Sequence, residues 1–194
     1  IHVFRDEQDI GNMGGVWKKI PFTMTLMLIG TLALTGFPFL SGFYSKDAII
    51  EFAYLKNSNI GNYVVVVGIF TAFLTSLYSW RLFIRTFFGE YNNKKISLKE
   101  LHESPAVMTI PLIILALGSI FSGFLFKDIF IGQSNLEFWN DSIFFLNDFK
   151  NTKISTWFLL LTPSIVLISI PIAYFTYLKD KSILDGIKKT NLPL

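Results

Sequence analysis

A lysine and two carboxylates lie close together in a part of the chain that is otherwise apolar. Lys46 and Asp47 are adjacent, and Glu51 follows Asp47 at a spacing of four, which places the two acids on one helix face and Lys46 on another. The surrounding stretch, Ala33–Phe52, reads ALTGFPFLSGFYSKDAIIEF. Ionisable residues inside an apolar span are costly and commonly mark ion or proton pathways. These side chains therefore indicate proton transfer, with Lys46 as the main candidate.

Each of these residues also has a plainer interpretation. Lys46 could extend its flexible stem to the far membrane interface and place its ammonium group in water. Asp47 could be a first-turn acid that interacts favourably with the positive end of a helix dipole. Glu51 could likewise be structural. The residue types alone leave these alternatives open.

The apolar segment that holds these residues, Pro21–Leu55, is too long for one straight membrane helix. As a single helix it would be about 52 Å long, whereas the hydrocarbon core of a bilayer is about 30 Å thick. Gly36, Pro38 and Gly42 indicate where it breaks, because proline removes a backbone donor and disfavours helix in the residue before it. We expect one half-helix from 21 to about 35 and another from about 43 to 55.

Unwound backbone at membrane depth is tolerated where it is buried in protein or lines water, and broken helices of this kind mark ion sites in transporters. Lys46 falls in the first turn of the second half-helix, whose dipole opposes a positive charge. The carbonyl end of the first half-helix attracts such a charge. A lysine in this balance can be neutral or charged depending on its surroundings, as a proton relay requires.

The composition places the chain among integral membrane proteins. It is 52% hydrophobic with a mean hydropathy of +0.50, and only 16% of its 194 residues are charged, against about 25% in soluble domains. We predict an all-α polytopic bundle of about four membrane passes, the first of them discontinuous. The expected order is an inner loop at 1–20, the broken helix at 21–55, a helix at 63–88, an inner loop at 89–104, a helix at 105–126, an outer loop at 127–154, a helix at 155–178 and an inner segment at 179–194.

Positive charge is distributed unequally between the two predicted sides. The side of the N-terminal loop carries twelve of the Lys and Arg residues, the opposite side carries four, and Lys46 is left over. The positive-inside rule then makes the N-terminal side cytoplasmic, or matrix in a mitochondrion. The net charge of +3 has this topological explanation, so we do not expect a nucleic-acid partner. In the outer loop, Leu136–Phe149 could be an interfacial helix or an ordered loop.

Metal and redox sites are not expected in this chain. It has no cysteine for a disulfide, a thiolate metal site or an iron–sulfur cluster, and His2 and His102 lie far apart. The run GNMGG at Gly11–Gly15 does not have the spacing of a nucleotide-binding loop and follows no strand. The chain begins Ile-His-Val rather than with Met, and we expect it to be a fragment of a longer polytopic protein.

Three stretches closely resemble a known family: Asp6–Thr23 (DEQDIGNMGGVWKKIPFT), Gly36–Glu51 (GFPFLSGFYSKDAIIE) and Phe73–Gly89 (FLTSLYSWRLFIRTFFG). They are similar to the antiporter-like subunit 5 of respiratory complex I, called subunit L in bacterial NADH:quinone oxidoreductase. The resemblance implies a proton-pumping module of two inverted repeats, each with a broken helix. Lys46 would be the key lysine of the second repeat, in the half-channel toward the positive side, and Asp47 the acid beside it.

The resemblance also implies partners and a location. The lipid bilayer and other membrane-arm subunits of complex I would surround the chain, in a bacterial or mitochondrial inner membrane. FMN, the iron–sulfur clusters and the NADH and quinone sites would belong to other subunits. Two alternatives stay open: a subunit of a multi-subunit cation/proton antiporter or ion-pumping hydrogenase, and a purely structural membrane element. The stretch DEQD at Asp6–Asp9 favours the respiratory subunit.

Overall fold

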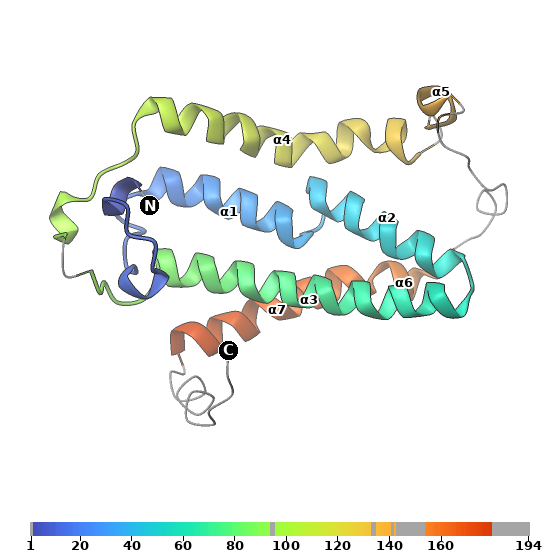
Figure 1. The fold of residues 1–194 in the computed structure, drawn as a ribbon, viewed down its shortest axis with the longest axis horizontal. Helices are drawn as coiled ribbons and strands as arrows, with labels where there is room; N and C mark the ends of the chain where they lie inside the picture. The colour runs from blue at the N-terminus through green and yellow to red at the C-terminus, as the bar shows by residue number, and fades with distance from the viewer. Residues whose placement is uncertain (1, 94–95, 133–134, 141, 143–153, 180–194) are drawn as a thin grey trace.

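The computed structural model (Figure 1) describes residues 2–93, 96–132, 135–140, 142 and 154–179. These residues form helices, turns and loops, and the described part contains no strand, which confirms the all-α prediction. The α-helices are α1 (Pro21–Thr35), α2 (Ser41–Leu55), α3 (Asn59–Phe87), α4 (Ala106–Phe130), α5 (Asn135–Trp139), α6 (Thr156–Leu159) and α7 (Leu161–Tyr174). Three 3₁₀ turns lie at His2–Phe4, Ile10–Asn12 and Leu98–Glu100, and a π-helical turn lies at Phe175–Lys179.

Three helical stretches are long and apolar enough to cross a membrane: Asn59–Phe87, Ala106–Phe130 and Thr156–Leu178. The helix α1 is apolar but shorter, and α2 continues its course after the break (Figure 1). Together these elements support the prediction of a polytopic membrane bundle. All three long stretches expose most of their surface, as helices facing lipid do.

The helix bounds differ from the sequence-based ones at two places. The turn expected at Lys56–Asn62 is shorter, because the Ser58 side chain accepts a hydrogen bond from the Gly61 N–H at 3.0 Å and caps α3. The helix α3 therefore begins at Asn59 rather than near Tyr63. At the same end of the bundle, α4 extends to Phe130 rather than ending near 126.

The two halves of the broken helix lie end to end between α4 and α3 (Figure 1). The helix α7 packs along α3, so α3 contacts α1, α2 and α7. A cluster around Trp80, Phe83 and Phe87 joins α3 to Val16 in the N-terminal loop, at the inner end of α1. A smaller cluster around Ile50, Val65 and Phe158 holds the outer end of α2. The break thus lies between two packed regions that fix its two ends.

Two sequence-based expectations fall wholly or partly outside the described residues. The outer-loop stretch 136–149 begins within the short helix α5, but residues 141 and 143–149 are not described. The inner segment predicted at 179–194 is described only at residue 179.

Candidate functional site

The first half-helix ends in a glycine cap. Gly36 has φ 84° and ψ 36°, a left-handed conformation that glycine adopts at little cost. Its N–H bonds to the Ala33 carbonyl at 3.2 Å, and the Phe37 N–H bonds to the Leu32 carbonyl at 3.0 Å. This pattern is a Schellman motif, which ends a helix and satisfies two of its last carbonyls. Pro38 follows in the turn and prevents the helix from continuing.

Gly42 has a different role from the one its sequence position indicates. Its position predicts that it belongs to the break, before a second half-helix beginning at about 43, but it is the second residue of the regular helix α2. A Cβ atom at Gly42 would overlap the carbonyl oxygen of Ala33. Its lack of a side chain therefore lets the start of α2 lie directly against the end of α1.

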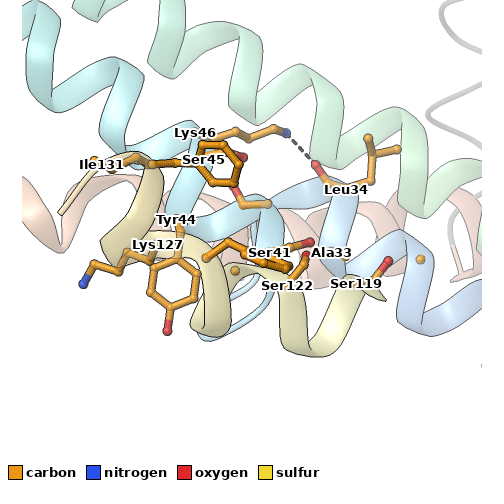
Figure 2. A pocket seen from close by; sticks show the side chains of 15 residues that line it. Ala33, Leu34, Ser41, Tyr44, Ser45, Lys46, Ser119, Ser122, Lys127 and Ile131 are labelled. Carbon is orange, nitrogen blue, oxygen red and sulfur yellow. Dashed lines mark hydrogen bonds between the residues drawn. The ribbon is translucent and has the colours of Figure 1, made fainter. Parts of the chain in front are cut away.

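Lys46 extends from α2 back to the end of α1. Its Nζ donates a hydrogen bond to the Leu34 carbonyl oxygen at 2.6 Å (Figure 2). Its aliphatic stem passes close to Gly36: a Cβ atom added at Gly36 would lie 3.5 Å from the Lys46 Cδ. Leu34 belongs to the last turn of α1, where a cation interacts favourably with the carbonyl dipoles. The ammonium group thus points to the middle of the broken helix and away from the outer end of α2, unlike a lysine that snorkels outward.

A cavity of about 670 Å³ opens beside Lys46, between the broken helix and the outer half of α4. Figure 2 shows its polar lining, which comes from both sides. Its hydroxyl groups belong to Ser41, Tyr44, Ser45, Ser119 and Ser122. Hydroxyl groups can both donate and accept hydrogen bonds, so such a lining can hold water and pass protons.

Lys127, near the C-terminal end of α4, also belongs to this site. It lines the same cavity with its ammonium 5.4 Å from the centroid of the Tyr44 ring. Its charge also interacts with the Glu51 carboxylate. Lys127 therefore adds a positive charge to the cavity beside the hydroxyl groups.

Asp47 and Glu51 do not line the hydroxyl-lined cavity beside Lys46 and lie on a different side of α2. The Asp47 carboxyl group lies near the hydroxyl of Thr162, a buried residue of α7. Its charge interacts with that of Glu51, one turn further along α2. The two acids therefore lie close enough to interact, as their spacing predicted, whereas Lys46 lines the cavity and they do not.

Comparisons with known proteins cover the same residues. Residues 1–75 match the family described as NADH:quinone oxidoreductase/Mrp antiporter, TM, and residues 78–139 match the family described as NADH dehydrogenase subunit 5 C-terminus. NADH-ubiquinone oxidoreductase chain 5 of Marchantia polymorpha is 50% identical over 146 residues, which are 75% of this chain and 22% of that protein. The protein of the same name from Phytophthora infestans is 47% identical over 159 residues, 82% of this chain and 24% of that protein.

The chain belongs to the subunit 5 family of NADH:quinone oxidoreductase. This confirms the family that its sequence motifs resemble. The chain spans about a fifth of the length of the curated relatives that it matches. The first family match contains the whole break with Lys46, Asp47 and Glu51, and the second contains α4 with Ser119 and Lys127.

Sequence reasoning missed three parts of the site in this family member. Thr162 has no signal in the sequence, because its contact with Asp47 depends on how α7 packs. The Leu34 carbonyl is a backbone group whose role follows from the cap at Gly36. Ser119 and Ser122 could have been noticed as hydroxyl residues at helical spacing in an otherwise apolar span.

Proposed function

We propose that this chain is part of a proton-translocating membrane subunit of an NADH:quinone oxidoreductase, and that Lys46 carries the proton at the break of its discontinuous helix. The observation that supports this most strongly is the hydrogen bond from the Lys46 Nζ to the Leu34 carbonyl, beside a hydroxyl-lined cavity. Family membership supports the same assignment. Electron transfer from NADH to quinone takes place in other subunits, which hold FMN, the iron–sulfur clusters and the quinone.

In this proposal, Lys46 alternates between a charged and a neutral form. The Leu34 carbonyl accepts a hydrogen bond from either form, because an ammonium and an amine both carry N–H donors. The charged form is favoured by the carbonyl end of α1, whereas Lys46 is the sixth residue of α2 and lies beyond the first turn in which the sequence predicted it. A change of nearby charge along the membrane arm then shifts the balance and releases the proton.

The proton leaves toward the outer side. Ser45 and Ser122 supply hydroxyl groups in the cavity, and Asp47 and Glu51 lie on the neighbouring face of α2 toward its outer end. The partners of the chain are the bilayer and other membrane-arm subunits, and a bacterial or a mitochondrial inner membrane fits it equally well. The twelve-to-four distribution of positive residues places the N-terminal loop on the inner side.

The second candidate function is cation/proton antiport, since the first matching family also contains Mrp antiporters. The match of residues 78–139 to the subunit 5 C-terminus favours the respiratory subunit. An antiporter would exchange Na⁺ for protons in vesicles without NADH. A respiratory subunit would move protons only while NADH is oxidised.

The test is the substitution Lys46→Ala in the full-length subunit, assembled in the complex and reconstituted in proteoliposomes. NADH oxidation and proton uptake are recorded together, with Lys56→Ala as the matched control at the exposed end of the same helix. We expect Lys46→Ala to lower proton uptake per NADH, or to abolish both activities, while Lys56→Ala keeps parental rates. Parental rates in an assembled Lys46→Ala complex would refute the proposal.

A further inference from the structure

The cavity beside Lys46 is lined by oxygen atoms that suit a metal cation as well as a proton. Hydroxyl groups from α2 and α4 line it. One of them, on Ser45, donates to the Gly42 carbonyl at 3.3 Å, so its oxygen can still accept a bond or bind a cation. Proteins bind hard cations through hydroxyl, carbonyl and carboxylate oxygens. The oxygen lining therefore does not by itself distinguish a proton from a sodium ion.

The charges that line the cavity do distinguish the two ions. Among the described lining residues, the charged ones are Lys46 and Lys127, and both are cations. Asp47 and Glu51, whose carboxylates could neutralise a metal ion, do not line the cavity. A sodium ion that entered it would therefore meet neutral oxygens and positive charge.

The two lysines act at different stages of the proposed function. A charged Lys46 occupies the Leu34 carbonyl through its hydrogen bond and repels any other cation. When Lys46 is neutral, this repulsion is absent, and Lys127 is the remaining positive charge in the described lining. Figure 2 shows the two side chains extending in different directions, with Lys127 beside Tyr44 and away from the Lys46–Leu34 bond. Lys127 is thus placed to stop a cation that enters from the outer end of α4.

Lys127 is exposed, but its neighbours keep its charge at the cavity. Its ammonium lies 5.4 Å from the centroid of the Tyr44 ring, a distance at which a cation is attracted to the ring face. The ring packs against Gly123, one turn before Lys127 on α4, where an added Cβ atom would lie 2.6 Å from the Tyr44 Cδ2. The Glu51 carboxylate also attracts the ammonium, from outside the lining.

We propose that Lys127 makes this site specific for protons, because its charge excludes sodium and other metal cations from the cavity while Lys46 is neutral. This rests on the proposed function of Lys46. A proton is bound covalently by the Lys46 amine, whereas a sodium ion gains only coordination by neutral oxygens. The repulsion from Lys127 is stronger in a protein interior than in water, since the effective dielectric constant is lower there. Lys127 does not carry the proton but selects the ion that can occupy the cavity.

Proton uptake per NADH at increasing sodium chloride tests the proposal in the complete complex in proteoliposomes. Lys127→Met removes the charge and keeps a long unbranched side chain, whereas Lys127→Arg keeps the charge. Lys56→Met is the matched control, at the exposed end of α2 and outside the cavity. Each protein is compared with itself in choline chloride at the same ionic strength. We expect sodium to inhibit Lys127→Met at concentrations at least tenfold lower than any that inhibit the parent, Lys127→Arg or Lys56→Met.

A second variant tests sodium binding without relying on activity. Lys127→Glu places a carboxylate beside the hydroxyl groups, which gives the cavity a negatively charged oxygen ligand. A ligand that binds the native state raises its stability. We expect sodium chloride, compared with choline chloride, to raise the thermal unfolding midpoint of the Lys127→Glu complex in detergent. Lys56→Glu and the parent should show no such difference.

The outcomes separate this proposal from the proposed function. If Lys46→Ala lowers proton uptake but Lys127→Met is no more sensitive to sodium than the parent, the role of Lys127 is wrong and that of Lys46 stands. If Lys46→Ala keeps parental rates, the proposed function fails and this proposal fails with it. Equal sodium inhibition of Lys127→Met and Lys56→Met would overturn the proposal as a general effect of salt.

The stability measurement decides if Lys127→Met does not assemble. A Lys127→Glu complex that sodium does not stabilise would show that the cavity oxygens cannot hold the ion. There would then be no metal cation for Lys127 to exclude, and the proposal would be overturned.

Discussion

The two ends of α1 are each bound by a charged side chain from a distant part of the chain. At its N-terminus, the Glu103 carboxylate accepts hydrogen bonds from the Phe22 N–H at 2.6 Å and from the Thr23 hydroxyl at 2.6 Å. Near its C-terminus, the Lys46 ammonium donates to the Leu34 carbonyl at 2.6 Å. Both pairs follow the helix dipole, with an acid at the positive end and a base at the negative end.

The two ends differ in what else surrounds the charge. Glu103 comes from the inner loop that precedes α4, and the Thr23 N–H adds a further, longer bond to the same carboxylate at 3.3 Å. Lys46 makes one hydrogen bond among the described residues and lines a cavity with hydroxyl groups. The same electrostatics therefore gives a fixed connection at one end and, in the proposed function, a group that exchanges its proton at the other.

The largest expected effect comes from closing the space at the outer end. Gly42→Val places a Cβ atom onto the Ala33 carbonyl oxygen, so α2 must move away from α1 and the Lys46–Leu34 bond is lost. We expect a loss of about 3 kcal/mol, the upper part of the range for overpacking. The amount of assembled subunit and its thermal unfolding midpoint in detergent would measure this loss.

A matched substitution elsewhere in the broken helix shows whether the loss of stability is specific to the contact between α1 and α2. Gly30→Val adds the same side chain as Gly42→Val, but its Cβ atom enters open space, and valine is less unfavourable than glycine inside a helix. It should leave the midpoint unchanged or raise it slightly. Equal midpoints for Gly42→Val and the parent would show that the close approach of α2 to α1 is unnecessary.

An intermediate effect is expected at the inner end. Glu103→Ala removes the acceptor from the first-turn donors of α1, and a charge-assisted bond of this kind contributes about 2 kcal/mol. Glu103→Gln keeps a carbonyl acceptor but loses the charge, so about half of that loss is expected. Proton uptake per NADH in the assembled Glu103→Gln complex should stay parental, because this end is a structural connection.

The Glu103 variants are compared with Lys46→Ala in both thermal stability and proton uptake. We expect the parent to have the highest thermal unfolding midpoint, Glu103→Gln an intermediate one and Glu103→Ala the lowest. If Glu103→Gln instead lowered proton uptake as much as Lys46→Ala at an unchanged midpoint, the inner end would also be part of the proton route. The distinction between a fixed and a titratable end would then be wrong.

The position of the helix break could be predicted from the sequence, but the contacts between its two half-helices could not. The length of the apolar segment, together with Gly36 and Pro38, located the end of α1. This was possible because segment length and a missing backbone donor can both be recognised from residues that are neighbours in the sequence. Gly42 was misinterpreted, since its role depends on the Ala33 carbonyl that lies against it in space. Charge spacing predicted that Asp47 and Glu51 share a face, which is also a local property.

The partners across helices could not be predicted in this way. The bond from Lys46 to Leu34 requires the two half-helices to be placed end to end, and the approach of Asp47 to Thr162 requires the position of α7. Glu103 gave no signal either, because the loop that carries it is distant from α1 in sequence. Such contacts depend on tertiary packing, which helical periodicity does not encode.

The smallest effect is expected from another charge pair on the inner side. Arg5 and Glu100 form an ion pair at 3.2 Å, with side chains 72% and 51% exposed. Water screens such a pair, and holding two long side chains in place costs entropy, so its coupling energy should be below about 0.5 kcal/mol. A double-mutant cycle of Arg5→Gln and Glu100→Gln, measured by thermal unfolding, gives this energy directly. A coupling energy above about 1 kcal/mol would contradict this expectation. An exposed ion pair would then stabilise the loops about as much as Glu103 does, and the number of hydrogen bonds that a carboxylate accepts would not explain its contribution to stability.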